Sequence, residues 1–214
     1  MEYTGKRFSV LGDSISTFKG VTVDDPNTFY GRVMCRKGGF RGVEDTWWRR
    51  VIDGLGGTVE RVNAYAGSCV TDGYGLGRGM SADVRVDALG APDVILLFGG
   101  ANDLGFGVPA AEFRAAYRLL LARLRARYPS AELVCSTLIN GRKVLEDEPF
   151  FLGEEPRKAL EPFSSVIREC AAEAGARLVD MAASGLRYDA IDGCHPTAGG
   201  MAQLAELWLA VLRA

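Results

Sequence analysis

The chain has 214 residues, 48% of them hydrophobic, which is enough to build a sizeable core, and we expect one α/β domain over residues 1–214. Its 25 Lys and Arg against 27 Asp and Glu leave a net charge of −2, so no basic face is forced and nucleic acid is not an expected partner. The N-terminus is polar and no stretch approaches the roughly 18 apolar residues of a membrane span, so we expect a cytoplasmic protein without membrane contact, although a secreted chain trimmed of its signal peptide would look the same.

Five short apolar runs, each typical of a buried strand, alternate along the chain with segments of helical periodicity. The alternation predicts a parallel sheet covered by helices on both faces. The strand-like runs are 7–13, 59–66, 93–100, 132–139 and 176–182. The helical repeats run from Trp47 to Leu55, Phe113 to Leu124, Phe163 to Cys170 and Met201 to Val211; Pro109, Pro162 and Pro196 mark expected helix starts and Gly175 an expected stop.

A serine stands directly after the first strand-like run, in Gly12-Asp13-Ser14-Ile15-Ser16. Ligands of open α/β sheets bind outside the carboxyl ends of the strands, so Ser14 stands where chemistry is expected. Ser and Asp after a strand are also ordinary turn and helix-capping residues, so this turn alone does not define a site.

His195 is the only histidine of the chain, and it follows Asp192 by three residues. A serine hydroxyl is a poor nucleophile and needs a base within hydrogen-bond reach, most often a histidine held by a carboxylate. The spacing allows a turn to bring the Asp192 carboxylate to the Nδ1 atom of His195, which leaves Nε2 to face a serine from elsewhere in the fold. The residues therefore predict a triad of Ser14, His195 and Asp192.

Two further segments supply candidate hydrogen-bond donors for an oxyanion. The run 93–98 ends in Gly99-Gly100-Ala101-Asn102-Asp103, which puts a carboxamide at the end of a buried strand, and the run before it ends in Gly67-Ser68. A glycine lets its backbone N–H approach a ligand closely. The N–H groups of Ser14 and Gly67 and the side chain of Asn102 would give three donors, and losing one such donor typically costs about 10²- to 10³-fold in rate.

With these four blocks in order, the chain resembles the SGNH, or GDSL-like, hydrolase superfamily. That family is named for a Ser in Gly-Asp-Ser, a Gly, an Asn in Gly-x-Asn-Asp and a His in Asp-x-x-His, which match Ser14, Gly67, Asn102 and His195. Ile15 departs from the family's leucine. The resemblance implies a three-layer flavodoxin-like fold with a five-stranded parallel sheet in the order 2-1-3-4-5, Asp192 as third triad member, and catalysis with no metal or organic cofactor.

Other readings of the residues compete less well. Glycines 73, 75, 77 and 79 alternate and do not give Gly-x-Gly-x-x-Gly, and no P-loop run is present. The five cysteines (35, 69, 135, 170 and 194) show no metal or redox spacing, so reduced thiols are expected, and Cys194 is a minor rival as nucleophile. A non-catalytic α/β binding module with a silent site, an acyltransferase, and a lysophospholipase or thioesterase with the same triad stay open as alternatives.

Three irregular segments, 19–45, 71–79 and 140–154, are expected to form the walls of the site. The first carries Asp24, Asp25, Tyr30, Arg32, Arg36 and Arg41. Polar, Arg-bearing loops without a long apolar lid favour short acyl chains on a polar carrier, and many proteins of the family deacetylate carbohydrates. We therefore expect an O-acetyl esterase acting on a small-molecule or carbohydrate ester. A face of Trp47 or Trp48 is a candidate sugar contact, although helical spacing favours burial.

Overall fold

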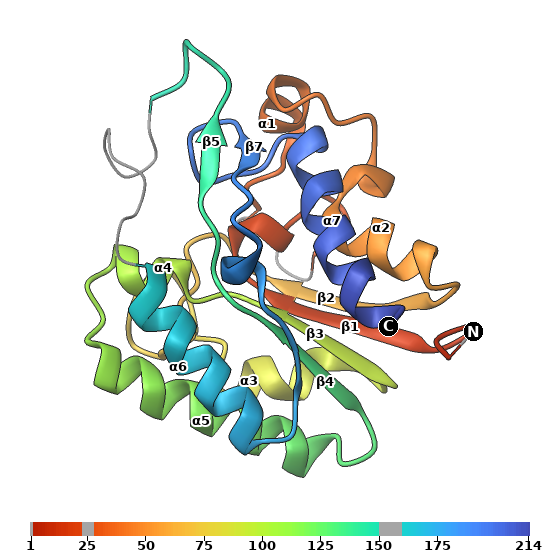
Figure 1. Ribbon diagram of the computed structural model, residues 1–214, viewed down its shortest axis with the longest axis vertical. Coiled ribbons are helices and arrows are strands. Elements are labelled where there is room, and N and C mark those ends of the chain that lie inside the picture. The colour runs from red at the N-terminus through yellow and green to blue at the C-terminus, as the bar shows by residue number, and fades with distance from the viewer. Residues whose placement is uncertain (1, 23–27, 150–159) are drawn as a thin grey trace.

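Five parallel strands form the central sheet of the computed structural model, which describes residues 2–22, 28–149 and 160–214 (Figure 1). The strands lie in the order β2-β1-β3-β4-β6. The α/β class and the five-stranded parallel sheet are confirmed. When only the five strands of this sheet are numbered, the order is 2-1-3-4-5, as expected. The last strand is labelled β6 because the short strand β5 lies outside this sheet. The bounds are β1 (Arg7–Gly12), β2 (Thr58–Ala64), β3 (Val94–Phe98), β4 (Glu132–Ser136) and β6 (Arg177–Val179).

The strands end earlier than the apolar runs that predicted them. The run 93–100 contains β3 only as far as Phe98, since Gly100 adopts φ +119°, a conformation that turns the chain and that side chains with a Cβ rarely adopt. The run 176–182 gives a strand of only three residues, followed by the 3₁₀ helix η5 (Met181–Ser184). Apolar residues at the carboxyl ends of the strands therefore continue into the loops that surround the site.

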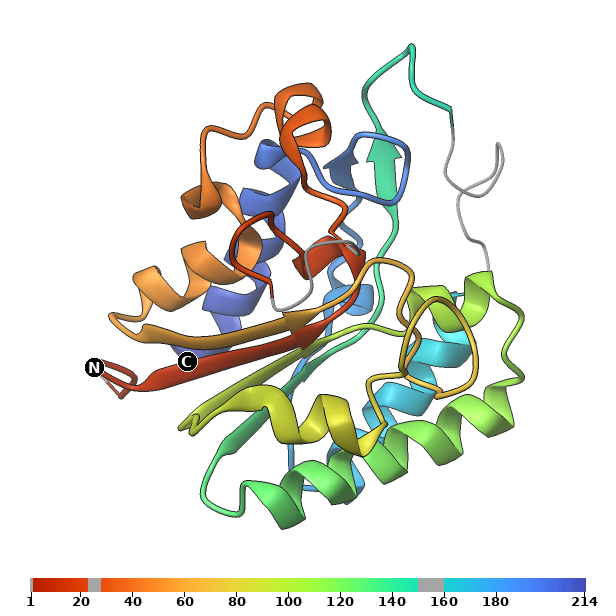
Figure 2. The same cartoon turned by 180° about the vertical axis from the view of Figure 1, so that it is seen from behind.

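Helices cover both faces of the sheet, which gives three layers (Figures 1 and 2). One face carries α2 (Trp47–Gly54) and α7 (Ala198–Leu212). The other carries α5 (Ala110–Arg127), α6 (Leu160–Glu173) and the short α3 (Asp83–Val86). Pro109 caps the start of α5 as expected, whereas Pro162 is the third residue of α6 and Pro196 precedes α7 by two residues.

Alternate side chains of the two central strands enter opposite cores. Val10 of β1 and Leu96 of β3 pack against α2 and α7, and their neighbours Leu11 and Leu97 pack against α5 and α6. Successive side chains of a strand point to opposite faces, so a strand buried on both faces is a continuous apolar run. This is why these runs were recognisable in the sequence.

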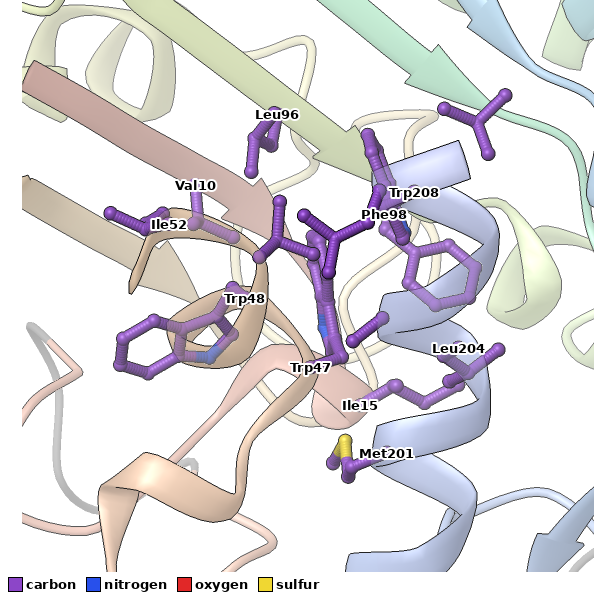
Figure 3. Close-up of a cluster of buried hydrophobic side chains, with 14 of the residues drawn as sticks. Val10, Ile15, Trp47, Trp48, Ile52, Leu96, Phe98, Met201, Leu204 and Trp208 are labelled. Carbon is purple, nitrogen blue, oxygen red and sulfur yellow. The ribbon is translucent and has the colours of Figure 1, made fainter. Parts of the chain in front are cut away.

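Tryptophans of α2 and α7 meet above the sheet in the first of these cores (Figure 3). The rings of Trp47 and Trp208 stack with centroids 4.8 Å apart and an interplanar angle of 18°. Trp47 and Trp48 are both at most 1% exposed, so neither offers a face to a sugar ring, and that candidate role is wrong. Their indole N–H groups instead donate to Ser16, two residues after Ser14.

Several short elements were not expected from the sequence. The segment 19–45 contains α1 (Arg32–Lys37) and the 3₁₀ helix η3 (Val43–Asp45), and α4 (Ala101–Gly105) follows β3. Strand β5 (Gly141–Lys143) pairs in parallel with β7 (Tyr188–Ala190) in a second small sheet. Two further 3₁₀ helices are η1 (Ser14–Ser16) and η4 (Asp87–Leu89). Elements of three to six residues show too little periodicity to be read from sequence alone.

The stacked tryptophans make α7 an anchor of the fold, which is tested by the change of Trp208 to alanine. We expect Trp208→Ala to lower the free energy of unfolding by about 3–5 kcal/mol, because a fully buried ring leaves a cavity. Urea denaturation measures the loss. The control Leu119→Ala, at a side chain 44% exposed on α5, should stay within about 0.5 kcal/mol of wild type. Equal effects of the two changes would contradict the assignment.

Candidate active site

Ser14 is the first residue of η1, directly beyond the carboxyl end of β1. β1 lies between β2 and β3, where the strand order reverses, and this is the place at which open α/β sheets bind ligands. The turn is held locally because the Asp13 carboxylate accepts a hydrogen bond from the Ile15 N–H at 3.0 Å. It is held from above by Trp47, whose indole donates to the Ser16 hydroxyl at 3.2 Å.

His195 and Asp192 approach Ser14 from the opposite end of the chain, in the loop between β7 and α7. The His195 Nε2 atom lies 2.9 Å from the Ser14 Oγ, and Nδ1 lies 2.7 Å from the Asp192 Oδ2. The second carboxylate oxygen of Asp192 accepts the backbone N–H groups of Cys194 and His195 at 3.0 and 2.8 Å. The structure thus brings the three side chains into one hydrogen-bonded series, and all are more than 90% buried.

The carboxyl of Asp192 is held in its ionised form. Burial by itself would raise its pKa, but hydrogen bonds from the His195 ring and from the N–H groups of His195 and Cys194 outweigh the burial. The pKa of Asp192 therefore lies below its ordinary value of 3.8. A fixed negative charge at this position orients the imidazole and stabilises it when it carries a second proton.

Gly67 and Asn102 lie on either side of the Ser14 turn, after β2 and β3 respectively. Gly67 has φ +75°, which favours glycine, and an added Cβ would lie 2.8 Å from the Leu76 side chain. The Asn102 Nδ2 donates to the Ser68 carbonyl at 3.0 Å, so the loop after β2 and the start of α4 are joined directly. Its amide has a second N–H donor besides this one.

The aspartate beside Asn102 fixes the same loop. Asp103 is fully buried, and its carboxylate accepts the N–H groups of Val70 and Thr71 at 2.7 and 2.9 Å. Burial raises the pKa of Asp103 although these two N–H groups act in the opposite direction. The Asn-Asp pair of the third block thus connects α4 to the Gly67 loop through both of its side chains.

Segment 19–45, which was expected to wall the site, covers His195 with Phe29, a residue that the sequence did not single out. The Phe29 ring stacks on the imidazole with centroids 3.5 Å apart and planes 9° apart. The next residue, Tyr30, is fully buried and donates its hydroxyl to the Pro196 carbonyl at 2.9 Å. Thr17 accepts the Phe29 N–H and donates its hydroxyl to the Ser14 carbonyl. One short segment therefore contacts the serine turn and the histidine loop together.

A small pocket adjoins the site. Its walls include residues next to each site side chain: Ile15 beside Ser14, Ala101 beside Asn102 and Cys194 beside His195. Its volume of about 20 Å³ has room for about one water molecule. The remaining lining residues are Asp13, Phe98, Leu138, Ile139, Asn140, Leu160, Tyr188 and Gly193.

The three loops that were expected to wall the site are only partly within the described residues. Asp24, Asp25 and residues 150–154 lie outside the described residues. Arg41 pairs with the buried Asp45, whereas Arg32 and Arg36 are exposed on α1, and an ion pair between Lys37 and Glu148 joins α1 to the segment after β5. In the 71–79 loop, Arg78 pairs with Asp72. Substrate contact by these loops stays a prediction.

None of the five cysteines forms a disulfide, and Cys194 is not the partner of the base, because Ser14 and Asp192 occupy both ring nitrogens of His195. No cluster of three His, Cys, Asp or Glu side chains with the geometry of a metal site occurs in residues 2–22, 28–149 and 160–214. Within the same residues, no helix has the length and apolar character needed to cross a membrane.

Comparison with known proteins places the chain among acylhydrolases. A model of the GDSL-like lipase/acylhydrolase family matches residues 10–203. A protein of Bacteroides uniformis assigned as a GDSL-like lipase is 29% identical, with a TM-score of 0.68 over 98% of this chain and 97% of that one. No curated protein shows significant similarity to the sequence.

Two further solved structures share the fold. One, from Bacteroides ovatus and also assigned as a GDSL-like lipase, has a TM-score of 0.72 at 24% identity, covering 98% of this chain and 99% of that one. The other is a family two carbohydrate esterase of Clostridium thermocellum in complex with cellohexaose, with a TM-score of 0.63 at 17% identity, covering 99% of this chain and 64% of that one. Since the family model spans nearly the whole sequence, the chain belongs to the GDSL-like lipase/acylhydrolase family.

Proposed function

We propose that this protein is a serine esterase that hydrolyses short-chain acyl esters, above all O-acetyl esters, on a carbohydrate or another polar carrier. The observation that carries the proposal is the series of hydrogen bonds from Ser14 through His195 to Asp192, at 2.9 and 2.7 Å. A serine, an imidazole and an ionised carboxylate in this arrangement form the constellation that activates a hydroxyl for acyl transfer.

In the first half of the reaction, the Ser14 Oγ attacks the ester carbonyl carbon while its proton passes to the Nε2 of His195. The ionised Asp192 stabilises the imidazolium that forms. Collapse of the tetrahedral intermediate breaks the bond to the alcohol, which takes the proton from Nε2 and leaves. In the second half, water attacks the acyl-enzyme with the same base, and the carboxylic acid departs from a restored Ser14.

The developing oxyanion needs donors that are fixed before the reaction. The N–H groups of Ser14 and Gly67 and the Nδ2 of Asn102 are assigned to this role, because they belong to three adjacent strand ends around the nucleophile. The hydrogen bond from Asn102 to the Ser68 carbonyl supports the assignment, since it fixes the amide plane beside the Gly67 loop.

The small adjoining pocket favours a short acyl group. Its volume of about 20 Å³ is close to the space that one methyl group occupies, and Leu138 and Ile139 form part of its wall. The polar carrier is supported by the arginines exposed on α1 and by the shared fold of the Clostridium thermocellum carbohydrate esterase.

Hydrolysis of p-nitrophenyl esters from acetate to decanoate tests the nucleophile and the chain length together. We expect wild-type activity to peak at acetate, and Ser14→Ala to lower kcat by at least about 10⁴-fold with an unchanged fold. Ser130→Ala, on the exposed surface, is the matched control and should keep wild-type rates. Activity that survives in Ser14→Ala would refute the mechanism, and a maximum at octanoate or decanoate would favour a lysophospholipase or lipase.

The pocket wall generates a second prediction. Ile139→Ala should raise the ratio of kcat/KM for butyrate over acetate by about tenfold, because the pocket then accepts the additional methylenes. Leu186→Ala is the matched control, since Leu186 lines the neighbouring cavity and is not among the residues that line this pocket. If the two substitutions shift the ratio equally, the acyl group does not occupy this pocket.

The lowered pKa of Asp192 gives a prediction on stability. An aspartate with a depressed folded-state pKa stabilises the fold above its ordinary pKa, and that contribution is lost as the pH falls through the folded value. The excess free energy of unfolding of wild type over Asp192→Asn should therefore shrink as the pH falls from 5 towards 3. Urea denaturation at each pH measures it, with exposed Asp147→Asn as control. A difference that grows on acidification would contradict the ionised state.

A further inference from the structure

Arg85 is a buried charged residue that takes no part in the proposed reaction steps. It belongs to the short helix α3, yet its side chain is only 1% exposed and is among the largest fully buried ones. Lysine and arginine are almost never fully buried unless their charged ends are satisfied by partners. A buried guanidinium beside the site therefore requires an explanation in terms of what it contacts.

The guanidinium has five N–H donors, and five hydrogen bonds account for them. Its Nε donates to the Asn63 side-chain oxygen at 2.5 Å, and Nη2 donates to the carbonyls of Asn63 and Gly12, both at 3.2 Å. Its Nη1 donates to the Ser68 hydroxyl at 2.8 Å and to the Arg78 carbonyl at 2.9 Å. Its Cζ atom also lies 3.9 Å from the Tyr65 ring centroid.

Four of the five acceptors, all except the Arg78 carbonyl, belong to the strands and loops that lead to Ser14 and Gly67. Gly12 is the last residue of β1 and stands two positions before Ser14. Asn63 lies near the end of β2, and Ser68 follows Gly67 directly. One rigid planar group therefore spans the end of β1, the end of β2 and the Gly67 loop.

The third donor is reached through Ser68. Its hydroxyl accepts from Arg85, and its carbonyl accepts from the Asn102 Nδ2 at 3.0 Å. Arg85 is thereby linked by hydrogen bonds to the segments that carry Ser14, Gly67 and Asn102. The His195 ring is held by Asp192, whose carboxylate in turn accepts the N–H groups of Cys194 and His195.

We propose that Arg85 is a positioning residue that sets the geometry of the oxyanion hole, by holding the Ser14 turn and the Gly67–Ser68 loop at a fixed separation. The inference rests on the proposed esterase function. An apolar side chain of similar length would fill the same volume but would remove one hydrogen-bond donor from each of five backbone and side-chain oxygens. Displacement of a donor by about 1 Å from the oxyanion costs about 10²-fold in rate.

The test compares Arg85→Met, Arg85→Lys and Ser68→Ala with wild type on p-nitrophenyl acetate. Reactive sites are counted by stoichiometric labelling of Ser14 with a fluorophosphonate. Because kcat is calculated per labelled site, unfolded protein does not lower its value. Arg49→Met is the matched control, because Arg49 is a partly exposed arginine paired with Asp53 on α2, away from this network.

For Arg85→Met we expect kcat per labelled site to fall about 10²-fold, with KM within threefold of wild type. The midpoint of the pH profile of kcat/KM should not move, because the triad keeps its own hydrogen bonds. The kcat per labelled site of Arg85→Lys should lie between those of wild type and Arg85→Met, since an ammonium keeps the charge but lacks the planar arrangement of donors of a guanidinium. A purely structural role would lower the yield of labelled protein and leave kcat per site unchanged.

Ser68→Ala removes the hydroxyl that accepts a hydrogen bond from Arg85 and so breaks the link from Arg85 through Ser68 to Asn102. We expect kcat to fall about tenfold. The double variant with Arg85→Met should fall no further than Arg85→Met alone, because the two changes act on one path. If Arg85→Met does not fold, Ser68→Ala and Arg85→Lys decide: a loss in kcat of more than fivefold at unchanged KM supports the proposal.

A kcat per labelled site within fivefold of wild type in every variant that folds overturns the positioning role, as does a change confined to KM. Failure of the proposed function has a different signature. Wild type would then be as inert as Ser14→Ala towards both the ester and the fluorophosphonate, and the inference about Arg85 would fall with it.

Discussion

The hydrogen bond between Ser14 and His195 joins residues that are 181 positions apart in sequence, and the rest of the structure makes this 2.9 Å contact possible. β1 brings the serine to the carboxyl edge of the sheet at the point where the strand order reverses. The loop between β7 and α7 brings the histidine to the same edge, and α7 is anchored by the stack of Trp208 on Trp47. Burial of both ends then removes water that would compete for the contact.

Around this contact, large side chains hold the backbone from several directions. The indoles of Trp47 and Trp48 donate to Ser16, so the apolar core reaches the nucleophile turn through hydrogen bonds as well as packing. Phe29 covers the ring of His195, and Arg85 connects the strand ends beneath the assigned oxyanion donors. Catalytic groups must be held to a fraction of an ångström, which a loop can achieve only with such support.

The sequence predicted the sheet and the triad because both leave local signals. Continuous apolar runs such as Val94–Phe98 mark strands buried on both faces, and short blocks around Ser14 and His195 mark strand ends that carry chemistry. Arg85 leaves no such signal, since an arginine in a short helix is normally expected to be exposed. Phe29 and the three-residue strands β5 and β7 were missed for a related reason, because only tertiary contacts determine where they lie.

The presence of one histidine makes this protein its own spectroscopic probe. In a proton or nitrogen NMR spectrum, every imidazole signal comes from the residue that touches Ser14 and Asp192. The Phe29 ring lies nearly parallel to that imidazole at 3.5 Å, so its ring current displaces the carbon-bound imidazole proton signals to high field. Any movement of the segment 28–30 away from the histidine would shift them back, so these signals report ligand-induced rearrangement at the site.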